Sequence, residues 1–250
     1  MIKIIMHGCG GKMGHVVSSI VANDDNCEIV AGIDPRDIEM GYPVFKNIAD
    51  CNIEADCIID FSTAAAVPAL LEYSKEKNIP VVLCSTGLSE ELNNKVVEYS
   101  KHVAILKSAN MSVGINLIMK VLKELAPVLA AEGFDIEIVE KHHNQKIDAP
   151  SGTAIALADA INEEFNNEYK YVFDRSQVRE KRSQKEIGIS AVRGGTIVGD
   201  HDVIFAGRDE VITINHTAYS KELFAVGAVK AAKYLAGKPA GFYTMKNVME

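Results

Sequence analysis

A glycine-rich turn between an apolar strand and an apolar-periodic helix constrains the fold of this chain more than any other feature. Residues 3–7 are a mostly apolar run, and Gly8, Gly11 and Gly14 follow it at intervals of three. Glycine lets a strand turn tightly into a helix and lets the backbone approach a pyrophosphate, which the helix N-terminus then binds. The segment therefore predicts the first strand, turn and helix of a dinucleotide-binding domain.

An acidic residue stands where such a domain needs one. Residues 28–33 read as the second strand, which ends at Asp34, 20 residues after Gly14. A carboxylate at this position accepts hydrogen bonds from ribose hydroxyls and repels a 2′-phosphate, whereas Arg36 offsets that repulsion. We therefore expect NADH to be the preferred cofactor and NADPH to be usable.

Strands and helices continue to alternate up to about residue 106. Ser89 reads as a helix N-cap, with acidic residues in the first turn where the helix dipole favours them. Alternation with short connections is typical of a Rossmann-type, doubly wound parallel sheet in an α/β protein. The predicted strands are 57–61, 79–83 and 104–106, and the predicted helices are 64–77 and 89–99.

The pattern changes near Asn110 and predicts a second, α+β domain with an antiparallel or mixed sheet. Apolar residues from 117 to 129 keep one face of a helix, which Pro127 should kink or end. Later extended segments contain few helix signals, and glycine turns separate them. These segments are 187–193, 198–206 and 211–218, and they are expected to join a strand at 136–139.

The domain boundaries follow from these patterns. Residues 221–235 read as a final helix that returns to the first domain. We predict a dinucleotide-binding domain over 1–112 and 220–250, and a substrate-binding and oligomerisation domain over 113–219. Residues 166–185 lack periodicity and are rich in Lys and Arg. A solvated loop is the favoured interpretation there, with a phosphate or partner patch as the alternative.

Charge and composition exclude several classes of function. A formal net charge of −8 argues against a nucleic-acid or anionic-membrane binder. No run of eighteen apolar residues occurs, and the N-terminal segment is too short for a signal peptide, so we expect a cytoplasmic protein. The five cysteines form no C-x-x-C, which favours reduced thiols over disulfides or a zinc site.

Residues 140–154 combine side chains that can donate or accept protons with a helix N-terminus that can bind an anion. The segment follows the apolar run 136–139 and leads into an alanine-rich helix that opens with Pro-Ser-Gly-Thr. A helix N-terminus favours an anion through its unpaired N–H groups and its dipole. His142, His143 and Lys146 precede that helix. The segment predicts a site for a negatively charged small molecule that must be protonated.

Acid–base chemistry explains this cluster better than a metal does. Adjacent histidines on a strand point to opposite faces, and no His, Cys, Asp or Glu near them has a convincing ligand spacing. Histidine titrates near neutrality, and Lys146 can reach the same anion from the loop. Asp148 either orients one of the basic groups or caps the helix.

The same segment carries a resemblance. From Glu140 to Ala154 it reads E-x-H-H-x-x-K-x-D-A-P-S-G-T-A, and on this signature the chain resembles the dihydrodipicolinate reductase family, also called 4-hydroxy-tetrahydrodipicolinate reductase. The similarity extends over nearly the whole chain. It includes Gly8-x-x-Gly11-Lys12-Met13-Gly14, Asp60-Phe61-Ser62, Ser85-Thr86-Gly87, Asn110-Met111-Ser112-Val113-Gly114 and Val192-Arg193-Gly194-Gly195.

The resemblance implies roles for named residues. His142 and Lys146 match the family's catalytic residues, and which of them delivers the proton stays open. Substrate contacts are implied for His143, Ser151, Gly152 and Thr153. Cofactor contacts are implied for Gly8, Cys9, Gly10, Gly11, Lys12, Met13, Asp34, Phe61, Cys84, Ser85, Thr86, Ser108, Ala109, Asn110 and Met111.

The resemblance also implies an activity. It is the NAD(P)H-dependent reduction of 4-hydroxy-tetrahydrodipicolinate, a cyclic dicarboxylate, to tetrahydrodipicolinate with loss of water, in the diaminopimelate route to lysine. Hydride would arrive from the first domain, and no metal would take part. A homotetramer joined through the sheet of the second domain is a further implication, with residues 187–218 supplying that surface.

Two other functions compete with this one. A non-catalytic, cofactor-sensing protein could use the same fold, because a fold does not fix a function. Another nicotinamide-dependent reductase, such as an amino-acid dehydrogenase, could share the first domain. The cluster of His142, His143 and Lys146 argues against the former, and the predicted dicarboxylate site discriminates against the latter.

Overall fold

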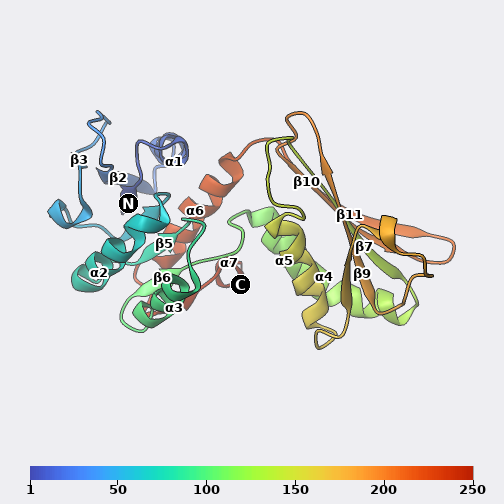
Figure 1. The fold of residues 1–250 in the computed structure, drawn as a ribbon. Coiled ribbons are helices and arrows are strands. Elements are labelled where there is room, and N and C mark those ends of the chain that lie inside the picture. Colours follow the sequence, from blue (N-terminus) through green and yellow to red (C-terminus); the bar gives the residue numbers. More distant parts are fainter. Residues whose placement is uncertain (250) are drawn as a thin grey trace. The chain divides into compact units, whose positions relative to one another are not determined.

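The computed structural model describes residues 1–249 and separates them into two units, each built on its own β-sheet (Figure 1). The first unit comprises Met1–Ser112 together with the segment that starts at Glu222. The second unit is Val113–Lys221. The polypeptide thus leaves the first unit once and returns to it with its final helices.

The first unit contains a seven-stranded sheet whose paired strands are all parallel. Their spatial order is β12-β6-β5-β4-β1-β2-β3, so the order reverses next to β1, where open α/β sheets bind ligands. The strands are β1 (Ile2–His7), β2 (Cys27–Ile33), β3 (Val44–Phe45), β4 (Cys57–Asp60), β5 (Val81–Leu83), β6 (Ala104–Leu106) and β12 (Gly241–Tyr243).

Helices cover both faces of this sheet, which explains why its central strands are apolar throughout. One face packs against side chains of α2 and α3, including Leu70 and Val96. On the other face α1 and α6 contact each other, and α6 also contacts β4, β5 and β6. The helices are α1 (Lys12–Ala22), α2 (Val67–Lys77), α3 (Glu90–Tyr99), α6 (Glu222–Leu235) and α7 (Met245–Val248), with short 3-10 helices η1 (Ile48–Asp50) and η2 (Ala64–Ala66).

The second unit contains a five-stranded mixed sheet in the order β11-β10-β7-β9-β8. Strand β7 lies at its centre, antiparallel to β10 and parallel to β9. The strands are β7 (Asp135–His142), β8 (Lys170–Phe173), β9 (Glu186–Arg193), β10 (Gly199–Ala206) and β11 (Val211–Ala218).

Two helices, α4 (Val113–Ala131) and α5 (Gly152–Glu163), pack on one face of this sheet (Figure 1). Burial alternates along β7, where Ile136, Ile138, Glu140 and His142 are buried and the intervening side chains are partly exposed. The period of two is that of a strand with one covered face. It places Glu140 and His142 on the covered face, in line with the apolar core.

The predicted fold class is confirmed, because a parallel doubly wound sheet is joined to a second unit with a mixed sheet. The predicted N-cap is also confirmed, since the Ser89 hydroxyl accepts the N–H of Leu92. No helix in residues 1–249 has the length and apolar character needed to span a bilayer.

Pro127 was predicted to kink or to end its helix, and the second of these outcomes was wrong. Helix α4 continues to Ala131 with Pro127 inside it. Proline removes a single backbone hydrogen bond and crowds one carbonyl. The buried side chains of Leu122, Ala126 and Leu129 lie in the core on both sides of this position, so tertiary packing keeps the helix continuous.

The segment 166–185 is not the plain loop that its composition predicts. It contains strand β8, which pairs in parallel with β9, and a short 3-10 helix η3 (Arg175–Gln177). Two of its three arginines form structural ion pairs: Arg175 with Glu186, and Arg182 with Asp135 and Glu137. Pairing with a strand far along the chain created an element that local periodicity did not show.

Candidate active site

The glycine turn lies at the carboxyl end of β1 and admits only glycine at two positions. Gly8 has a φ of +82°, and an added Cβ would lie 2.7 Å from the carbonyl oxygen of Phe61. At Gly14 an added Cβ would lie 2.4 Å from the carbonyl oxygens of Gly8 and Cys9. Gly11 is the N-cap of α1 and supplies no side-chain cap, so the first helical N–H groups are presented to a ligand.

Asp34 follows β2 and is nearly inaccessible to solvent, at 3% exposure. Its Oδ2 accepts the N–H of Gly10 at 3.0 Å, which ties the acidic residue to the glycine turn. Arg36 donates two hydrogen bonds to the carboxylate, from Nε and from a terminal nitrogen, both at 2.8 Å. The hydrogen bonds from Arg36 are the largest influence on Asp34 and lower its pKa to about 2. Asp34 is therefore ionised at neutral pH.

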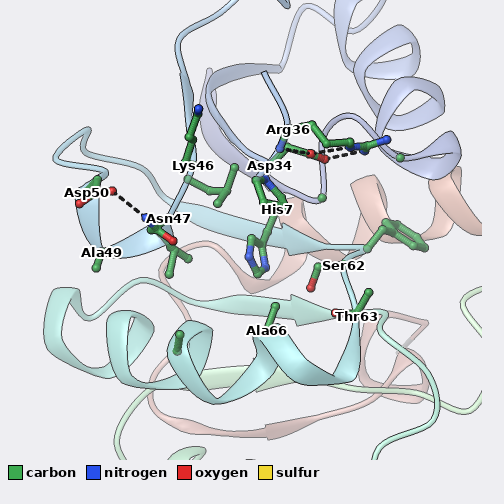
Figure 2. A pocket seen from close by; sticks show the side chains of 17 residues that line it. His7, Asp34, Arg36, Lys46, Asn47, Ala49, Asp50, Ser62, Thr63 and Ala66 are labelled. Atoms are coloured by element: carbon green, nitrogen blue, oxygen red, sulfur yellow. Dashed lines mark hydrogen bonds and ion pairs between the residues drawn. The ribbon is translucent and has the colours of Figure 1, made fainter. Parts of the chain in front are cut away.

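A cavity of about 810 Å³ opens beside this turn (Figure 2). Four residues with predicted cofactor contacts line it, namely Gly8, Gly11, Asp34 and Phe61. The side chains of Arg36 and Lys46 also line it, so cationic groups face the same space as the Asp34 carboxylate. This volume, the glycine turn and the uncapped helix suit the adenosine and phosphate parts of a dinucleotide.

Two residues that line this cavity, His7 and Ser62, belong to a polar network that the sequence did not reveal. His7, the last residue of β1, lines the cavity, and its Nδ1–H donates to Asp60 Oδ1 at 2.7 Å. The same carboxylate accepts the hydroxyls of Ser62 at 2.5 Å and Ser85 at 2.6 Å. Burial favours the neutral acid, but hydrogen bonds from His7, Ser62 and Ser85 outweigh it, and the pKa of Asp60 is lowered. A polar residue at the end of each of two apolar strands was the signal that could have revealed this network.

The remaining predicted cofactor residues follow β5 and β6. Ser85 is fixed by Asp60, whereas Cys84 is half-buried and, like the other four cysteines, free. In the segment after β6, the Asn110 Oδ1 accepts the N–H of Ser112 at 2.7 Å. Helix α6 approaches this segment so closely that a Cβ at Gly227 would lie 1.8 Å from the Met111 carbonyl oxygen. None of the predicted residues Cys9, Gly10, Lys12, Met13, Cys84, Ser85, Thr86, Ser108, Ala109, Asn110 and Met111 lines the 810 Å³ cavity.

In the second unit the centre of the site is a buried carboxylate–imidazole pair. His142 ends β7, and its Nδ1 lies 2.6 Å from Glu140 Oε2, two residues back on the same face. Glu140 is 0% exposed and His142 is 8% exposed. Because an ionised carboxylate only accepts, the imidazole Nδ1 carries the proton and Nε2 is left for a substrate.

Three further donors hold Glu140. Arg193 donates to both carboxylate oxygens, at 2.6 and 2.7 Å, and the N–H of Ser151 donates at 2.9 Å. Burial acts to raise the pKa of Glu140, but Arg193, His142 and Ser151 together lower it. Burial lowers the pKa of His142, and Glu140 opposes that effect. At neutral pH the pair is thus a carboxylate and a neutral imidazole.

Lys146 lies on the loop that follows. Its ammonium donates to both oxygens of Asp148, at 2.7 and 2.8 Å, and its side chain is one-fifth exposed. The Lys146 hydrogen bond is the main reason why the pKa of Asp148 is lowered. Of the two roles open to Asp148, orientation of a basic group is the one observed. The loop is held to the turn after β9, where Asn144 N–H donates to Gly195 O at 3.2 Å.

The N-terminus of α5 faces open space. Ser151 is its N-cap, and the buried hydroxyl accepts the N–H of Ala154 at 3.1 Å. An added Cβ at Gly152, the first helical residue, would meet no atom within 4 Å. The start of the helix is thus accessible to an anion at Gly152. The Ser151 hydroxyl itself is engaged in capping and in a contact with His201 Nε2 at 2.9 Å.

Together these residues bring two kinds of group into one unit: a neutral imidazole and an ammonium that can exchange protons, and a helix start that favours a carboxylate. His143 follows His142, is partly exposed and uses its carbonyl to accept the Lys146 N–H at 3.1 Å. Within residues 1–249, no three His, Cys, Asp or Glu side chains are grouped so that they could hold a metal ion. The arrangement suits protonation of a bound carboxylate-bearing molecule.

Comparisons with known proteins agree over the full length. A family model described as dihydrodipicolinate reductase, N-terminus, matches residues 2–111, and one described as dihydrodipicolinate reductase, C-terminus, matches residues 114–249. Two relatives are named 4-hydroxy-tetrahydrodipicolinate reductase. That of Clostridium novyi is 51% identical and that of Caldanaerobacter subterraneus is 52% identical, and each match covers 100% of this chain and 99% of the relative.

Solved structures also match this chain over nearly its whole length. A dipicolinate-bound dihydrodipicolinate reductase from Paenisporosarcina superposes with a TM-score of 0.80 at 26% identity, and the match covers 99% of both chains. A myo-inositol dehydrogenase from Corynebacterium glutamicum has a TM-score of 0.61 at 14% identity, with 97% of this chain and 90% of that chain covered. The latter likeness shows only a shared fold.

Proposed function

The chain belongs to the dihydrodipicolinate reductase family, and on that premise we propose how its residues perform the reaction. It is an NAD(P)H-dependent oxidoreductase that reduces 4-hydroxy-tetrahydrodipicolinate to tetrahydrodipicolinate with loss of water, in diaminopimelate and lysine biosynthesis. The observation that carries the proposal at residue level is the buried Glu140–His142 pair next to Lys146 and the open helix start.

Lys146 is the proposed proton donor. A bound nicotinamide cofactor would supply a hydride to the conjugated imine that remains once the substrate has lost its 4-hydroxyl as water, and the enamine so formed must then gain a proton. Since the pKa of His142 is lowered, its imidazole is neutral at neutral pH and has no second proton to give, whereas the Lys146 Nζ is a donor that Asp148 orients. A positioned acid accelerates such a step by roughly 10²- to 10⁴-fold. His142 would accept a hydrogen bond at Nε2 and orient the substrate, with its ring fixed by Glu140.

The N-terminus of α5 is the proposed site for a substrate carboxylate. Gly152 and Thr153 would bind it through the first turn of the helix, with His143 beside them on the preceding loop. Support comes from the open space at Gly152 and from the relative whose structure contains dipicolinate, itself a cyclic dicarboxylate. For Ser151 we propose a positioning role, since its buried hydroxyl caps the helix.

For the cofactor, we propose that NADH is preferred and that NADPH is also used. Asp34 would accept ribose hydroxyls, and Arg36 would turn from Asp34 towards a 2′-phosphate. The turn from Gly8 to Met13 would contact the pyrophosphate. Contacts nearer the nicotinamide are proposed for Phe61, Cys84, Ser85, Thr86, Ser108, Ala109, Asn110 and Met111.

The two units are proposed to divide this work. The first, with 1–112 and 220–250, would bind the dinucleotide, and 113–219 would bind the substrate and form a homotetramer. The sheet face opposite α4 and α5 is the proposed contact between copies, because it exposes apolar side chains. Val192 on β9 is 45% exposed, and Val211 on the edge strand β11 is 62% exposed. We further propose that the protein is cytoplasmic.

A coupled assay tests the activity. Purified protein is given the condensation product of pyruvate and aspartate semialdehyde, and oxidation of NADH and of NADPH is followed separately. The proposal expects oxidation with both cofactors and a lower KM for NADH. Absence of oxidation with either cofactor would favour a non-catalytic, cofactor-sensing protein, and oxidation only with a keto acid and ammonia would favour another reductase, such as an amino-acid dehydrogenase.

A further inference from the structure

His201 is a buried histidine beside the site, and the proposed reaction gives it no role. It lies on β10, directly opposite Glu140 in the antiparallel register, and is 5% exposed. The alternation along β10 turns His201 to the face covered by α4 and α5, the same face as Glu140 and His142. Its position is therefore set by the strand pairing that fixes the catalytic residues.

His201 contacts both halves of the site. Its Nε2 lies 2.9 Å from the Ser151 hydroxyl, which caps α5. Its ring also meets the His142 ring edge-on, with centroids 5.1 Å apart and an interplanar angle of 77°. The same strand makes room for His142, since a Cβ at Gly199 would lie only 3.2 Å from His142 Nε2.

The hydrogen-bond directions follow from the donors available. The Ser151 oxygen already accepts the Ala154 N–H, so its hydroxyl proton is free to be donated to His201 Nε2. His201 is then a neutral imidazole with its proton on Nδ1, in accord with the burial that lowers its pKa to about 4. That Nδ1 is buried and has no hydrogen-bond partner. Keeping an unpaired polar atom buried is unfavourable, so packing alone does not explain a histidine here.

We propose that His201 is a positioning residue that aligns the helix start of α5, through Ser151, with the imidazole of His142. The inference rests on the proposed carboxylate site at Gly152 and Thr153. Glu140 holds the backbone N–H of Ser151 and the Nδ1 of His142, and His201 holds the Ser151 hydroxyl and the ring of His142. The carboxylate-binding and proton-exchanging groups are thus fixed from two adjacent strands.

Four variants test the proposal: His201→Phe, His201→Gln, Ser151→Ala and the double variant His201→Phe with Ser151→Ala. Phenylalanine keeps the ring and removes the hydrogen bond, whereas the glutamine amide reaches the position of Nε2. Loss of one hydrogen bond corresponds to about a five- to tenfold change in an equilibrium constant. His201→Phe should raise the Kd for dipicolinate and the KM for the substrate by about that factor, with the KM for NADH unchanged, and His201→Gln should restore most of the loss.

The double variant shows whether His201 acts through Ser151. If it does, the double variant should bind dipicolinate no more weakly than Ser151→Ala alone; losses that multiply would overturn the proposal. Phe205→Leu, a buried change on the same face of β10, is the control for reduced stability and should leave both constants unchanged. If His201→Phe fails to fold, His201→Gln and Ser151→Ala still decide the matter through their dipicolinate affinity.

Failure of this proposal can be told from failure of the proposed function. Calorimetric titration with dipicolinate measures the carboxylate site without turnover. No binding to the unmodified protein would defeat the proposed carboxylate site, and the proposal for His201 with it. Equal binding to the unmodified protein and to His201→Phe would overturn only the role of His201.

Discussion

The Nδ1–H of His142 donates to Glu140 Oε2 at 2.6 Å, in a pair that is almost entirely buried. The contact fixes the ring and its tautomer, so that Nε2 is the nitrogen left for the substrate. Glu140 also accepts from Arg193 and from the Ser151 N–H, which joins the imidazole, a guanidinium and the start of α5 in one network.

Glu140→Gln should lower both activity and stability. The substitution removes the charge that raises the pKa of His142, so this pKa should fall further, and it leaves the Arg193 guanidinium without its ionic partner. Breaking a buried ion pair typically costs about 3–5 kcal/mol. Thermal unfolding and a pH profile of kcat check the two effects. Glu137→Gln, on the same strand but the other face, is the control, and similar pH profiles for both variants would contradict the role of Glu140.

Lys146→Ala should reduce kcat by roughly 10²- to 10⁴-fold, because it removes the proposed proton donor. The KM for NADH should stay within about twofold, since the lysine is placed with the substrate. Steady-state kinetics with each reactant varied in turn measures both constants. Lys141→Ala, which removes a nearby lysine paired with Asp202 on the opposite face, should keep its kcat. Comparable losses in kcat and in NADH binding would contradict the role of Lys146 as proton donor.

Arg36→Ala should separate the two cofactors. Loss of the guanidinium would remove the proposed charge-assisted contact to a 2′-phosphate, which corresponds to about a tenfold or larger rise in the KM for NADPH. The KM for NADH should hold or fall, because the Asp34 carboxylate would lose the two hydrogen bonds that now occupy it. Parallel titrations with NADH and NADPH give the ratio. Equal changes for both cofactors would show that Arg36 does not discriminate between them.

Gly14→Ala should disrupt the nucleotide-binding turn. The added Cβ would lie 2.4 Å from two carbonyl oxygens, so the turn must shift, and overpacking of this kind costs about 1–3 kcal/mol. A lower Tm and weaker NADH binding by fluorescence titration are expected. Gly41→Ala is the matched control, since its Cβ would meet nothing within 4 Å. An unchanged affinity for NADH in Gly14→Ala would argue against the turn as the pyrophosphate site.

The burial of His201 predicts a loss of stability in mild acid. Its pKa falls from 6.5 to about 4 on folding, mainly through burial. Above pH 6.5 both states are neutral there and the group has no effect. Below that pH His201 binds a proton in the unfolded chain but stays neutral in the folded protein. The free energy of unfolding therefore falls until about pH 4, by about 3 kcal/mol in total.

Thermal melts of the protein and of His201→Phe between pH 8 and pH 4 measure this contribution. The Tm of the variant should fall less on acidification, because phenylalanine does not bind a proton in either the folded or the unfolded state. Histidines that do not contact His201 contribute equally to both proteins and cancel in the comparison. Parallel curves for the two proteins would show that folding does not lower the pKa of His201.

Local sequence determined the elements and the chemistry at their ends. The period of the apolar residues and the spacing of Gly8, Gly11 and Gly14 identified the parallel sheet, since these are properties of neighbouring residues. The segment from Glu140 to Ala154 likewise carried His142, Lys146 and the cap of α5 within 15 residues. Where packing overrode local signals, the predictions failed: α4 continues through Pro127, and β8 forms because β9 lies beside it.

Tertiary structure alone decided which distant residues complete the site. His7 and Asp60 are 53 positions apart and meet because β1 and β4 pair in parallel, and His201 meets Ser151 across 50 positions because β10 pairs with β7. Strand register sets such contacts, and register depends on the whole sheet and its core, not on the few residues that a motif contains. The sequence thus determined which chemical groups this protein carries in its site, and the register of its strands decided which of them hold one another in place.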